Sequence, residues 1–295
     1  MTTPAPARGL IALLRLPYWL MTGGLSLLTS FAITKNPLDL SVQTVLLIFF
    51  SMAFITSAGF AINDYFDKES DAVIKPKRPI PSGALSLRQV VAVSSVLFAA
   101  GLALSIFINW LSFAIIAADS ALLLVYSMLV KRKSGFAANA LVGILTGTAF
   151  LYGEATISIP PTISIISLSL YPIALGTVGG NVLRDVLSLE GDSKSGYPTL
   201  PQKIGTENSA RVAAGFFLLT GLLAPLPFFV GNFNFYYLVP ILAWSALLIY
   251  SSIRLANVSS TLANVKKYER VVTMSMILLP LALILQAASH VVGGL

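Results

Sequence analysis

Residues 43–62 read QTVLLIFFSMAFITSAGFAI, and residues 63–71, which follow directly, read NDYFDKESD. The first stretch has no charged side chain, and it is as long as the roughly 20 residues that a helix needs to cross a membrane. The second stretch carries the carboxylates of Asp64, Asp67, Glu69 and Asp71. The sequence therefore predicts a membrane-spanning helix that ends in an acidic cluster at the membrane surface.

The composition extends this prediction to the whole chain. Of the 295 residues, 56% are hydrophobic and 11% are charged, whereas a soluble protein carries about 25% charged residues. This excludes a soluble single domain, a disordered chain and a secreted disulfide scaffold. The absence of cysteine excludes thiol catalysis, zinc–thiolate sites and iron–sulfur clusters, and a single histidine, His290, excludes multi-histidine metal sites.

Apolar runs recur between polar clusters, and none shows the strict alternation of a barrel strand. We expect an all-α polytopic membrane protein with about nine transmembrane helices in one bundle, and a turn at Asn109-Trp110 between the third and fourth. The predicted spans are 10–33, 43–62, 88–108, 111–130, 136–153, 162–183, 210–230, 235–256 and 270–292.

The basic residues predict the orientation. Of the 19 Lys and Arg residues, all except Lys35 fall on the side of the membrane that holds the N-terminus. Because positive loops stay in the cytoplasm, we expect a multi-pass cell-membrane protein with a cytoplasmic N-terminus. The net charge of +7 then reflects topology and attraction to anionic membrane lipids, and no nucleic acid is expected as a partner.

A second polar cluster repeats the spacing of the first. Asp64, Asp67 and Asp71 are three and seven residues apart, as are Asp185, Ser188 and Asp192, and a basic loop with Gly and Pro follows each set. The chain therefore resembles one domain, 1–295, built from two weakly repeated halves of about 1–135 and 136–295. Membrane folds of this kind often place their site between the repeats.

Carboxylates spaced in this way repel one another unless a cation lies between them. Oxygen ligands without His or Cys favour Mg²⁺, which readily shares its coordination with phosphate. Nearby basic side chains would hold the phosphate oxygens. The alternative interpretation is that each cluster is only a set of solvated charges that end a helix.

The two clusters resemble the two signatures of the UbiA superfamily of intramembrane prenyltransferases. The first match is Asn63-Asp64-x-x-Asp67-x-x-x-Asp71 with Arg78-Pro79-Ile80-Pro81-Ser82-Gly83. The second runs from Asp185 to Asp192 and includes Glu190-Gly191-Asp192, with Thr199-Leu200-Pro201 after it. Ser188 departs from the pattern, because many members of the archaeal ether-lipid branch have Asp there; the serine resembles the chlorophyll-synthase branch instead.

The resemblance implies Mg²⁺-dependent transfer of a polyisoprenyl group, of geranylgeranyl type, from its diphosphate to a membrane acceptor on the cytoplasmic side. The leading acceptor is a lipid phosphate, geranylgeranylglyceryl phosphate, used in archaeal ether-lipid synthesis. An aromatic acceptor such as 4-hydroxybenzoate or a quinone precursor, and a chlorophyllide, are the alternatives. An ion-coupled transporter is the non-enzymatic alternative, although transporter sites usually lie near the membrane midplane.

The same resemblance implies the site residues. The catalytic residues would be Asp64, Asp67 and Asp185. The Mg²⁺ ligands would be Asn63, Asp64, Asp67, Asp71, Asp185 and Asp192. The diphosphate or the acceptor would be bound by Asn63, Lys77, Arg78, Lys131, Arg184, Arg15 and Tyr126.

Four charged or titratable residues lie outside the clusters. Arg15, in the first span, could reach the membrane surface or hold an anionic acceptor headgroup. Asp119 lies in the middle of the fourth span, where a charge is costly, so we expect it to face the bundle interior in a structural polar contact. Glu154 needs no special role, and His290 is expected to be an interfacial residue.

Overall fold

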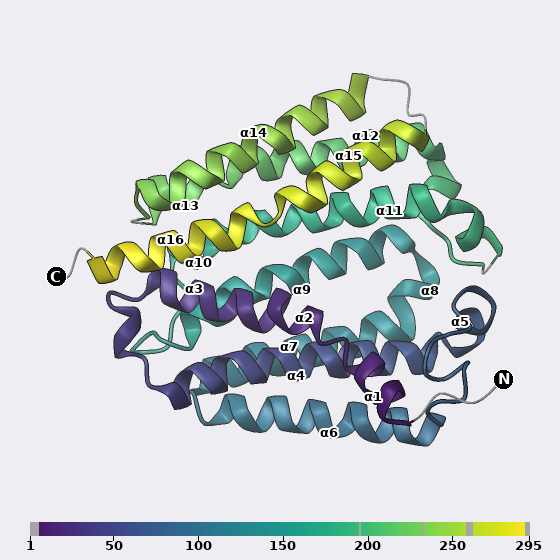
Figure 1. The fold of residues 1–295 in the computed structure, drawn as a ribbon, viewed down its shortest axis with the longest axis horizontal. Coiled ribbons are helices and arrows are strands. Elements are labelled where there is room, and N and C mark those ends of the chain that lie inside the picture. Colours follow the sequence, from purple (N-terminus) through teal and green to yellow (C-terminus); the bar gives the residue numbers. More distant parts are fainter. Residues whose placement is uncertain (1–5, 195, 232, 258–261, 293–295) are drawn as a thin grey trace.

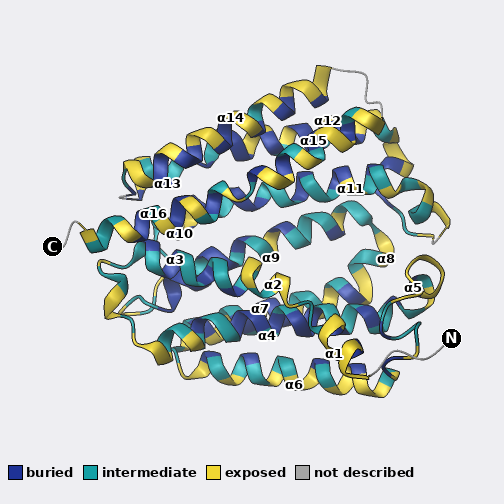
Figure 2. Ribbon diagram, in the orientation of Figure 1, coloured by how far each residue is buried: buried dark blue, intermediate teal, exposed yellow. Residues whose placement is uncertain are grey.

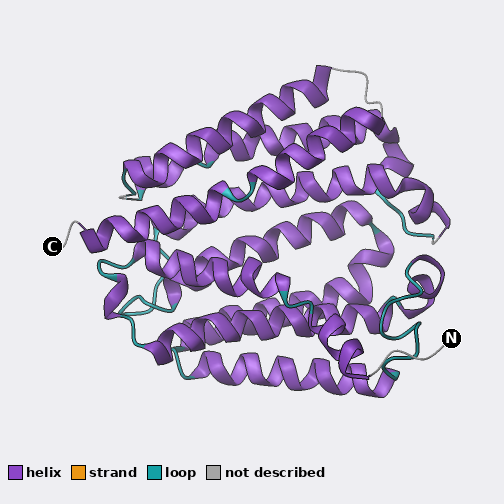
Figure 3. Cartoon of the chain, in the orientation of Figure 1, coloured by secondary structure: helices purple, strands orange, loops and turns teal. Residues whose placement is uncertain are grey.

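The computed structural model describes residues 6–194, 196–231, 233–257 and 262–292, and these residues form helices and no strand (Figure 3). The two ends of the predicted domain, 1–5 and 293–295, lie outside the described residues. Nine described segments are long and apolar enough to cross a membrane, which confirms the predicted all-α polytopic fold. They are Pro6–Ile33, Val42–Phe66, Leu87–Ile106, Trp110–Lys133, Gly135–Ala155, Ile165–Lys194, Leu200–Val230, Phe235–Asn257 and Leu262–Val292.

The first span is not a continuous helix. It comprises α1 (Pro6–Leu14), α2 (Pro17–Trp19), a π-helical turn (Leu20–Gly24) and α3 (Leu25–Ile33). Between α1 and α2, Arg15 adopts a left-handed backbone with φ of 49°. Pro17 follows two residues later in the first turn of α2, a position that tolerates proline because its missing N–H is not needed there. The chain therefore changes direction at Arg15.

The next four spans begin at capped N-termini. The side chains of Ser41, Ser86 and Asn109 each accept a backbone N–H in the first turn of the helix that follows, which satisfies donors that a helix start leaves unpaired. The cap at Asn109 confirms the predicted turn. The elements are α4 (Val42–Phe66), α5 (Lys68–Ile74), α6 (Leu87–Ile106), α7 (Trp110–Val125), a π-helical turn (Tyr126–Val130), α8 (Lys131–Lys133) and α9 (Gly135–Ala155).

The rest of the described chain forms the remaining four spans. Its elements are α10 (Ile165–Leu170), a 3₁₀ turn (Tyr171–Ala174), α11 (Leu175–Lys194), α12 (Leu200–Leu223), α13 (Leu226–Val230), α14 (Phe235–Asn257), α15 (Leu262–Ser275) and α16 (Leu278–Val292). The sixth, seventh and ninth spans extend by several residues beyond their predicted bounds. Hydropathy marks the part of a helix that lies in lipid, whereas these helices continue through polar turns.

The long helices run side by side along the longest axis of the molecule (Figure 1). In the first half α4 packs on α6, and in the second half α11 packs on α12. The two halves are joined by the contacts of α3 with α9 and with α16. α1, α5 and α8 lie at one end, and the last turns of α16 lie at the opposite end (Figure 1). We call the end with α5 and α8 the site end.

The outer faces of the helices are apolar. Exposed residues line the outside of the bundle (Figure 2), and among them Leu222, Val239 and Ile277 are 59%, 66% and 69% exposed. A soluble protein rarely leaves large apolar patches in water. Lipid is therefore the medium that fits this surface.

Close helix contacts depend on several glycines. A Cβ atom on Gly143 would lie 2.5 Å from Val178 Cγ2, and one on Gly153 would lie 2.6 Å from the carbonyl oxygen of Ser26. By contrast, a Cβ atom on Gly180 would meet no atom within 4 Å. Gly143 and Gly153 therefore let neighbouring helices approach, as small residues do in membrane bundles.

We expect Gly153→Ala to destabilise the protein by about 1–3 kcal/mol, because the new methyl group would displace the backbone of α3. The matched change Gly180→Ala should be neutral or slightly stabilising, since alanine is the better helix former. The thermal unfolding midpoint of both variants, measured in the same detergent, checks this. Equal midpoints would contradict the role of Gly153.

Candidate functional site

The first acidic cluster lies at the site end, where α4 passes into α5. Asp67, with φ of −87° and ψ of 1°, interrupts the helix between Phe66 and Lys68. Residues three and seven positions apart would share one face of a continuous helix, but here the helix is interrupted at the middle carboxylate. Nevertheless Asp64, Asp67 and Asp71 are all buried, at 4%, 7% and 4% exposure. Buried carboxylates lose their hydration, so each needs a cation or hydrogen-bond donors beside it.

Two arginines supply this compensation for Asp64 and Asp71. Arg15 Nη2 lies 2.7 Å from Asp64 Oδ1. Arg78 Nη1 lies 2.8 Å from the same oxygen and 2.5 Å from Asp71 Oδ2. Arg78 thereby ties the end of α4 to α5. The Arg15 guanidinium also lies over the ring of Phe60, 4.3 Å from its centroid.

The backbone around each arginine explains its position. The left-handed conformation of Arg15 costs on the order of 1–3 kcal/mol for a residue with a side chain, and the contacts with Asp64 and Phe60 offset this strain. Arg78 precedes the buried Pro79 in a loop of turns. That loop returns through Gly83, whose φ of 73° is readily adopted by glycine.

Asp67 has three partners. Asn63 Nδ2 donates to Asp67 Oδ2 at 2.7 Å, and the Lys131 ammonium forms an ion pair with the same oxygen. The Tyr197 hydroxyl donates to Asp67 Oδ1 at 2.6 Å. Burial and the carboxylate of Asp67 raise the pKa of Tyr197 above its usual value, so the phenol keeps its proton at neutral pH and remains a donor.

The second cluster lies near the end of α11, which continues unbroken to Lys194. Asn139 Nδ2, from α9, donates to Asp185 Oδ2 at 2.7 Å. Ser188 Oγ donates to Asp192 Oδ2 at 2.5 Å. Ser188 stands at the middle position of the second cluster, where the first cluster has the carboxylate of Asp67. The serine therefore donates a hydrogen bond to the last carboxylate, Asp192.

The loop after α11 connects the two clusters. Besides its bond to Asp67, the Tyr197 hydroxyl lies 3.1 Å from Ser70 Oγ, and Lys131 Nζ lies 4.8 Å from the centroid of the Tyr197 ring. Tyr126, in the π-helical turn before α8, is within electrostatic range of both Asp67 and Asp185. Two clusters far apart in the sequence therefore face one region, at the site end.

Two predicted residues lie outside this network. Lys77 is exposed and forms no ion pair or hydrogen bond within the described chain. Arg184 is also exposed: its Nε lies 3.6 Å from Glu269 Oε1 on α15, and its Nη1 donates to Asn181 Oδ1. The part of each in phosphate binding stays a prediction.

Sequence reasoning did not identify Tyr197 or Asn139. Tyr197 lies in the loop after the second cluster, and the corresponding loop after the first cluster contains Arg78. This correspondence between the two loops could have identified Tyr197 from the sequence. Asn139 is an amide within the apolar fifth span, and a polar group within a span often faces another polar group.

The polar residues outside the clusters are structural. Asp119 is buried and accepts a hydrogen bond of 2.8 Å from Thr148 Oγ1, which confirms the expected interior contact. Glu154, expected to need no role, accepts the backbone N–H of Ser164 at 2.8 Å and thus fixes the start of α10. His290 contacts the carbonyl oxygen of Ala32 at 3.2 Å, at the end opposite the clusters.

The donor chemistry of the first cluster fits Mg²⁺. All of its candidate ligands are oxygens, and Asn63 Oδ1 is buried with no hydrogen-bond partner in the described chain. Three basic side chains, Arg15, Arg78 and Lys131, now neutralise the carboxylates, and no three acidic or histidine residues of the described ranges surround one point. These bases are 20–23% exposed, so water reaches part of each side chain.

Comparison with known proteins agrees with this geometry. The model of the UbiA prenyltransferase family matches residues 21–287. The chain is 37% identical over 234 residues to the digeranylgeranylglyceryl phosphate synthase of Natronomonas pharaonis, which covers 79% of this chain and 82% of the relative.

Solved structures are similar over nearly the whole length. One, concerned with digeranylgeranylglyceryl phosphate synthase in membranes, gives a TM-score of 0.81 at 28% identity and covers 96% of this chain and 98% of its own. A UbiA homolog from Archaeoglobus fulgidus, bound to DMAPP and Mg²⁺, gives a TM-score of 0.65 at 21% identity, with 91% and 98% covered. At this identity the second likeness shows the fold alone.

We expect Arg78→Gln to destabilise the protein by about 1–3 kcal/mol, because it leaves two buried carboxylates with fewer partners. This destabilisation is smaller than the loss expected for a fully buried ion pair, because Arg78 is partly exposed. The neighbouring change Lys77→Gln removes the same charge without breaking a contact, and it should stay within about 0.5 kcal/mol of the parent. Chemical unfolding in detergent compares the two. A similar effect of both would mean that the ion-pair network does not stabilise the fold.

Proposed function

This chain belongs to the UbiA prenyltransferase family, and from this we propose that it transfers a geranylgeranyl-type group from its diphosphate to geranylgeranylglyceryl phosphate. The product would be the second ether bond of an archaeal-type lipid, with release of diphosphate. The 37% identity to a digeranylgeranylglyceryl phosphate synthase over 79% of the chain carries the choice of acceptor. The convergence of two acidic clusters on one end of the bundle supports the diphosphate chemistry.

In the proposed site, Mg²⁺ and the diphosphate would be held by Asn63, Asp64, Asp67 and Asp71 of the first cluster together with Asp185 and Asp192 of the second. Mg²⁺ held by these residues would neutralise the negative charge that develops on the leaving diphosphate. The carboxylates of the two halves then act together, which explains why both halves keep an acidic cluster at the same end.

The basic residues have two roles in this proposal. Before substrate binds, Arg15, Arg78 and Lys131 neutralise buried carboxylates. With Mg²⁺–diphosphate bound, these side chains would be available to donate charge-assisted hydrogen bonds to the phosphate oxygens. Arg15, which extends from the first span to Asp64 on α4, is our candidate for binding the phosphate of the acceptor, and Lys131 is our candidate for binding the diphosphate.

Aromatic side chains would stabilise the carbocation that forms at the reacting carbon of the donor. Breaking the allylic C–O bond leaves a delocalised cation, and the π-faces of rings attract cations. Tyr126 and Tyr197 lie between the clusters, and Tyr197 already carries the Lys131 ammonium over its ring. The acceptor hydroxyl attacks the cation and loses its proton, which a cluster aspartate or the departing diphosphate can take.

We propose that the site end faces the cytoplasm of the cell membrane. The multi-pass character rests on the nine apolar helices, and the direction rests on the distribution of Lys and Arg. The donor, a water-soluble headgroup on a long apolar chain, would then enter with its diphosphate from the cytoplasm and its chain in the bilayer.

We expect Asp64→Asn and Asp185→Asn each to lower the rate of prenyl transfer by about 10²–10³-fold, because each removes a charge needed as the leaving group departs. The assay uses labelled geranylgeranyl diphosphate, Mg²⁺ and the glyceryl phosphate ether, and chelation of Mg²⁺ should abolish product. Glu207→Gln, an exposed change on α12, is the matched control and should leave the rate within about twofold.

The same assay tests the acceptor. Product only with 4-hydroxybenzoate or a chlorophyllide would overturn the proposed acceptor but keep the diphosphate chemistry. No product and no diphosphate release with any acceptor would contradict the enzymatic proposal as a whole.

The orientation has its own test, because the chain has no cysteine. We expect Lys35→Cys to react with a membrane-impermeant maleimide in intact cells, and Lys203→Cys to react only after the cells are permeabilised. Both positions are exposed, so accessibility from one side decides the result. The reverse pattern would place the site end outside.

A further inference from the structure

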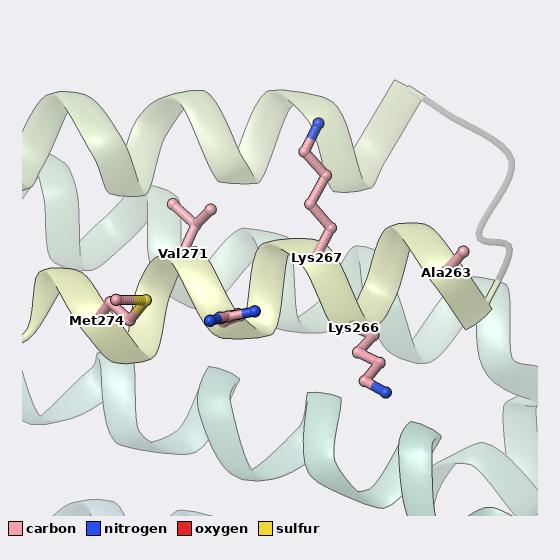
Figure 4. Close-up of a pocket in the computed structure, with 6 residues that line it drawn as sticks. Ala263, Lys266, Lys267, Val271 and Met274 are labelled. Carbon is pink, nitrogen blue, oxygen red and sulfur yellow. The ribbon is translucent and has the colours of Figure 1, made fainter.

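A groove of about 590 Å³ lies against α15, apart from the two acidic clusters. Ala263, Lys266, Lys267, Arg270, Val271 and Met274 line it (Figure 4). These residues recur at helical spacing on the outer face of α15, while Val265, Tyr268 and Val272 face inward and are buried. Lys266 and Lys267 extend to opposite sides of the helix (Figure 4).

The groove is strongly cationic. Lys266, Lys267 and Arg270 are exposed, and none forms an ion pair with a described carboxylate. Glu269, the acidic residue of α15, does not pair with these three cations. Its Oε1 lies 3.6 Å from Arg184 Nε and accepts a hydrogen bond from Thr273. Arg254 on α14 adds a further positive charge nearby, since its Nε donates to the Tyr268 hydroxyl at 3.1 Å.

An apolar surface continues from the cationic end toward the middle of the span. Met274, Ile277, Leu281 and Ile284 are 65%, 69%, 41% and 49% exposed. Met274 lies one turn after Arg270 on α15, Ile277 lies in the turn that separates α15 from α16, and Leu281 and Ile284 lie on α16. The groove therefore has a cationic end and an exposed hydrocarbon-like surface that runs away from it.

We propose that this surface binds a membrane lipid with a phosphate headgroup. The headgroup lies at Arg270, with the Lys266 and Lys267 side chains on either side of it, and the hydrocarbon chain lies along Met274 and the apolar residues beyond it. Unpaired cations at a membrane surface attract anionic headgroups. A free phosphate compound or an acidic protein would use only the charges, whereas a lipid with a phosphate headgroup would use both the charges and the apolar surface beside them.

The position links the groove to the second cluster. α15 packs on α11, and Arg184, which contacts Glu269, is the neighbour of Asp185 in sequence. A lipid at the groove would therefore lie one helix away from the proposed prenyl-transfer site. The lipid inference does not depend on that function, because lipid binding is measured without turnover.

The test counts lipids bound to the purified full-length protein by native mass spectrometry from a neutral detergent. Phosphatidic acid, phosphatidylglycerol and phosphatidylcholine are the probes. The parent should retain one phosphatidic acid or phosphatidylglycerol molecule at lower concentration than phosphatidylcholine. The variant K266Q/K267Q/R270Q should bind the anionic lipids at least about tenfold more weakly, since each cation contributes to headgroup attraction.

Two control variants separate this site from general charge attraction. R8Q/R88Q/K203Q removes three exposed charges elsewhere, and it should bind lipid like the parent. K266R/K267R/R270K keeps the charges, and it should also bind like the parent. Equal weakening in the first control, or equal binding of phosphatidylcholine, would overturn the proposal. So would displacement of the lipid by low concentrations of inorganic diphosphate, which would indicate a site for soluble phosphate.

A second measurement does not depend on the folding of any variant. Photo-methionine incorporated into the parent protein places a photoreactive group at Met274, and Met21, which is 55% exposed in the first span, is the internal control. We expect the peptide with Met274 to crosslink to phosphatidylglycerol in preference to phosphatidylcholine, and the peptide with Met21 to show no preference. The same lipid ratio at both positions would contradict the proposal.

Discussion

Three buried carboxylates at the end of a membrane bundle need three positive charges, and the arrangement of the site end follows from that need. Asp64, Asp67 and Asp71 cannot lose their hydration alone. Arg15, Arg78 and Lys131 come from three different segments to meet them. The break in the first span, the turns around Pro79 and the short α8 are each explained as the means by which one of these cations reaches its carboxylate. The same charges are what a Mg²⁺–diphosphate substrate would replace.

The fold could be predicted because lipid imposes strict length and charge rules on a chain. A run such as 43–62 has no stable alternative to a spanning helix, and even the turn at Asn109 was visible from one polar residue. The extent of α11 to Lys194 and the start of α15 at Leu262 were missed, because hydropathy does not detect helix that continues outside lipid. The broken backbone at Arg15 was also missed, because it depends on a partner 49 residues away.

The site was predictable in its ligand types and less so in its geometry. Spacing singled out the two clusters that contain Asp64, Asp67, Asp71, Asp185 and Asp192, and the family resemblance gave these residues as ligands, which stays a prediction. Spacing did not show that Asp67 would break the helix or that Tyr197 would bridge the clusters, since both depend on how the two halves pack. The two-repeat interpretation stays a prediction, although the shared site end favours it.

The central claim is that both clusters bind one Mg²⁺–diphosphate group, and the most direct measurement is the affinity for an unreactive donor. Geranylgeranyl thiodiphosphate can be titrated against the purified protein with and without Mg²⁺, by calorimetry. The account predicts binding that requires Mg²⁺ and that weakens at least about tenfold in both Asp64→Asn and Asp185→Asn, since each change removes one charged ligand from one of the two clusters. Binding that is unchanged without Mg²⁺, or that is unaffected by Asp185→Asn, would contradict it.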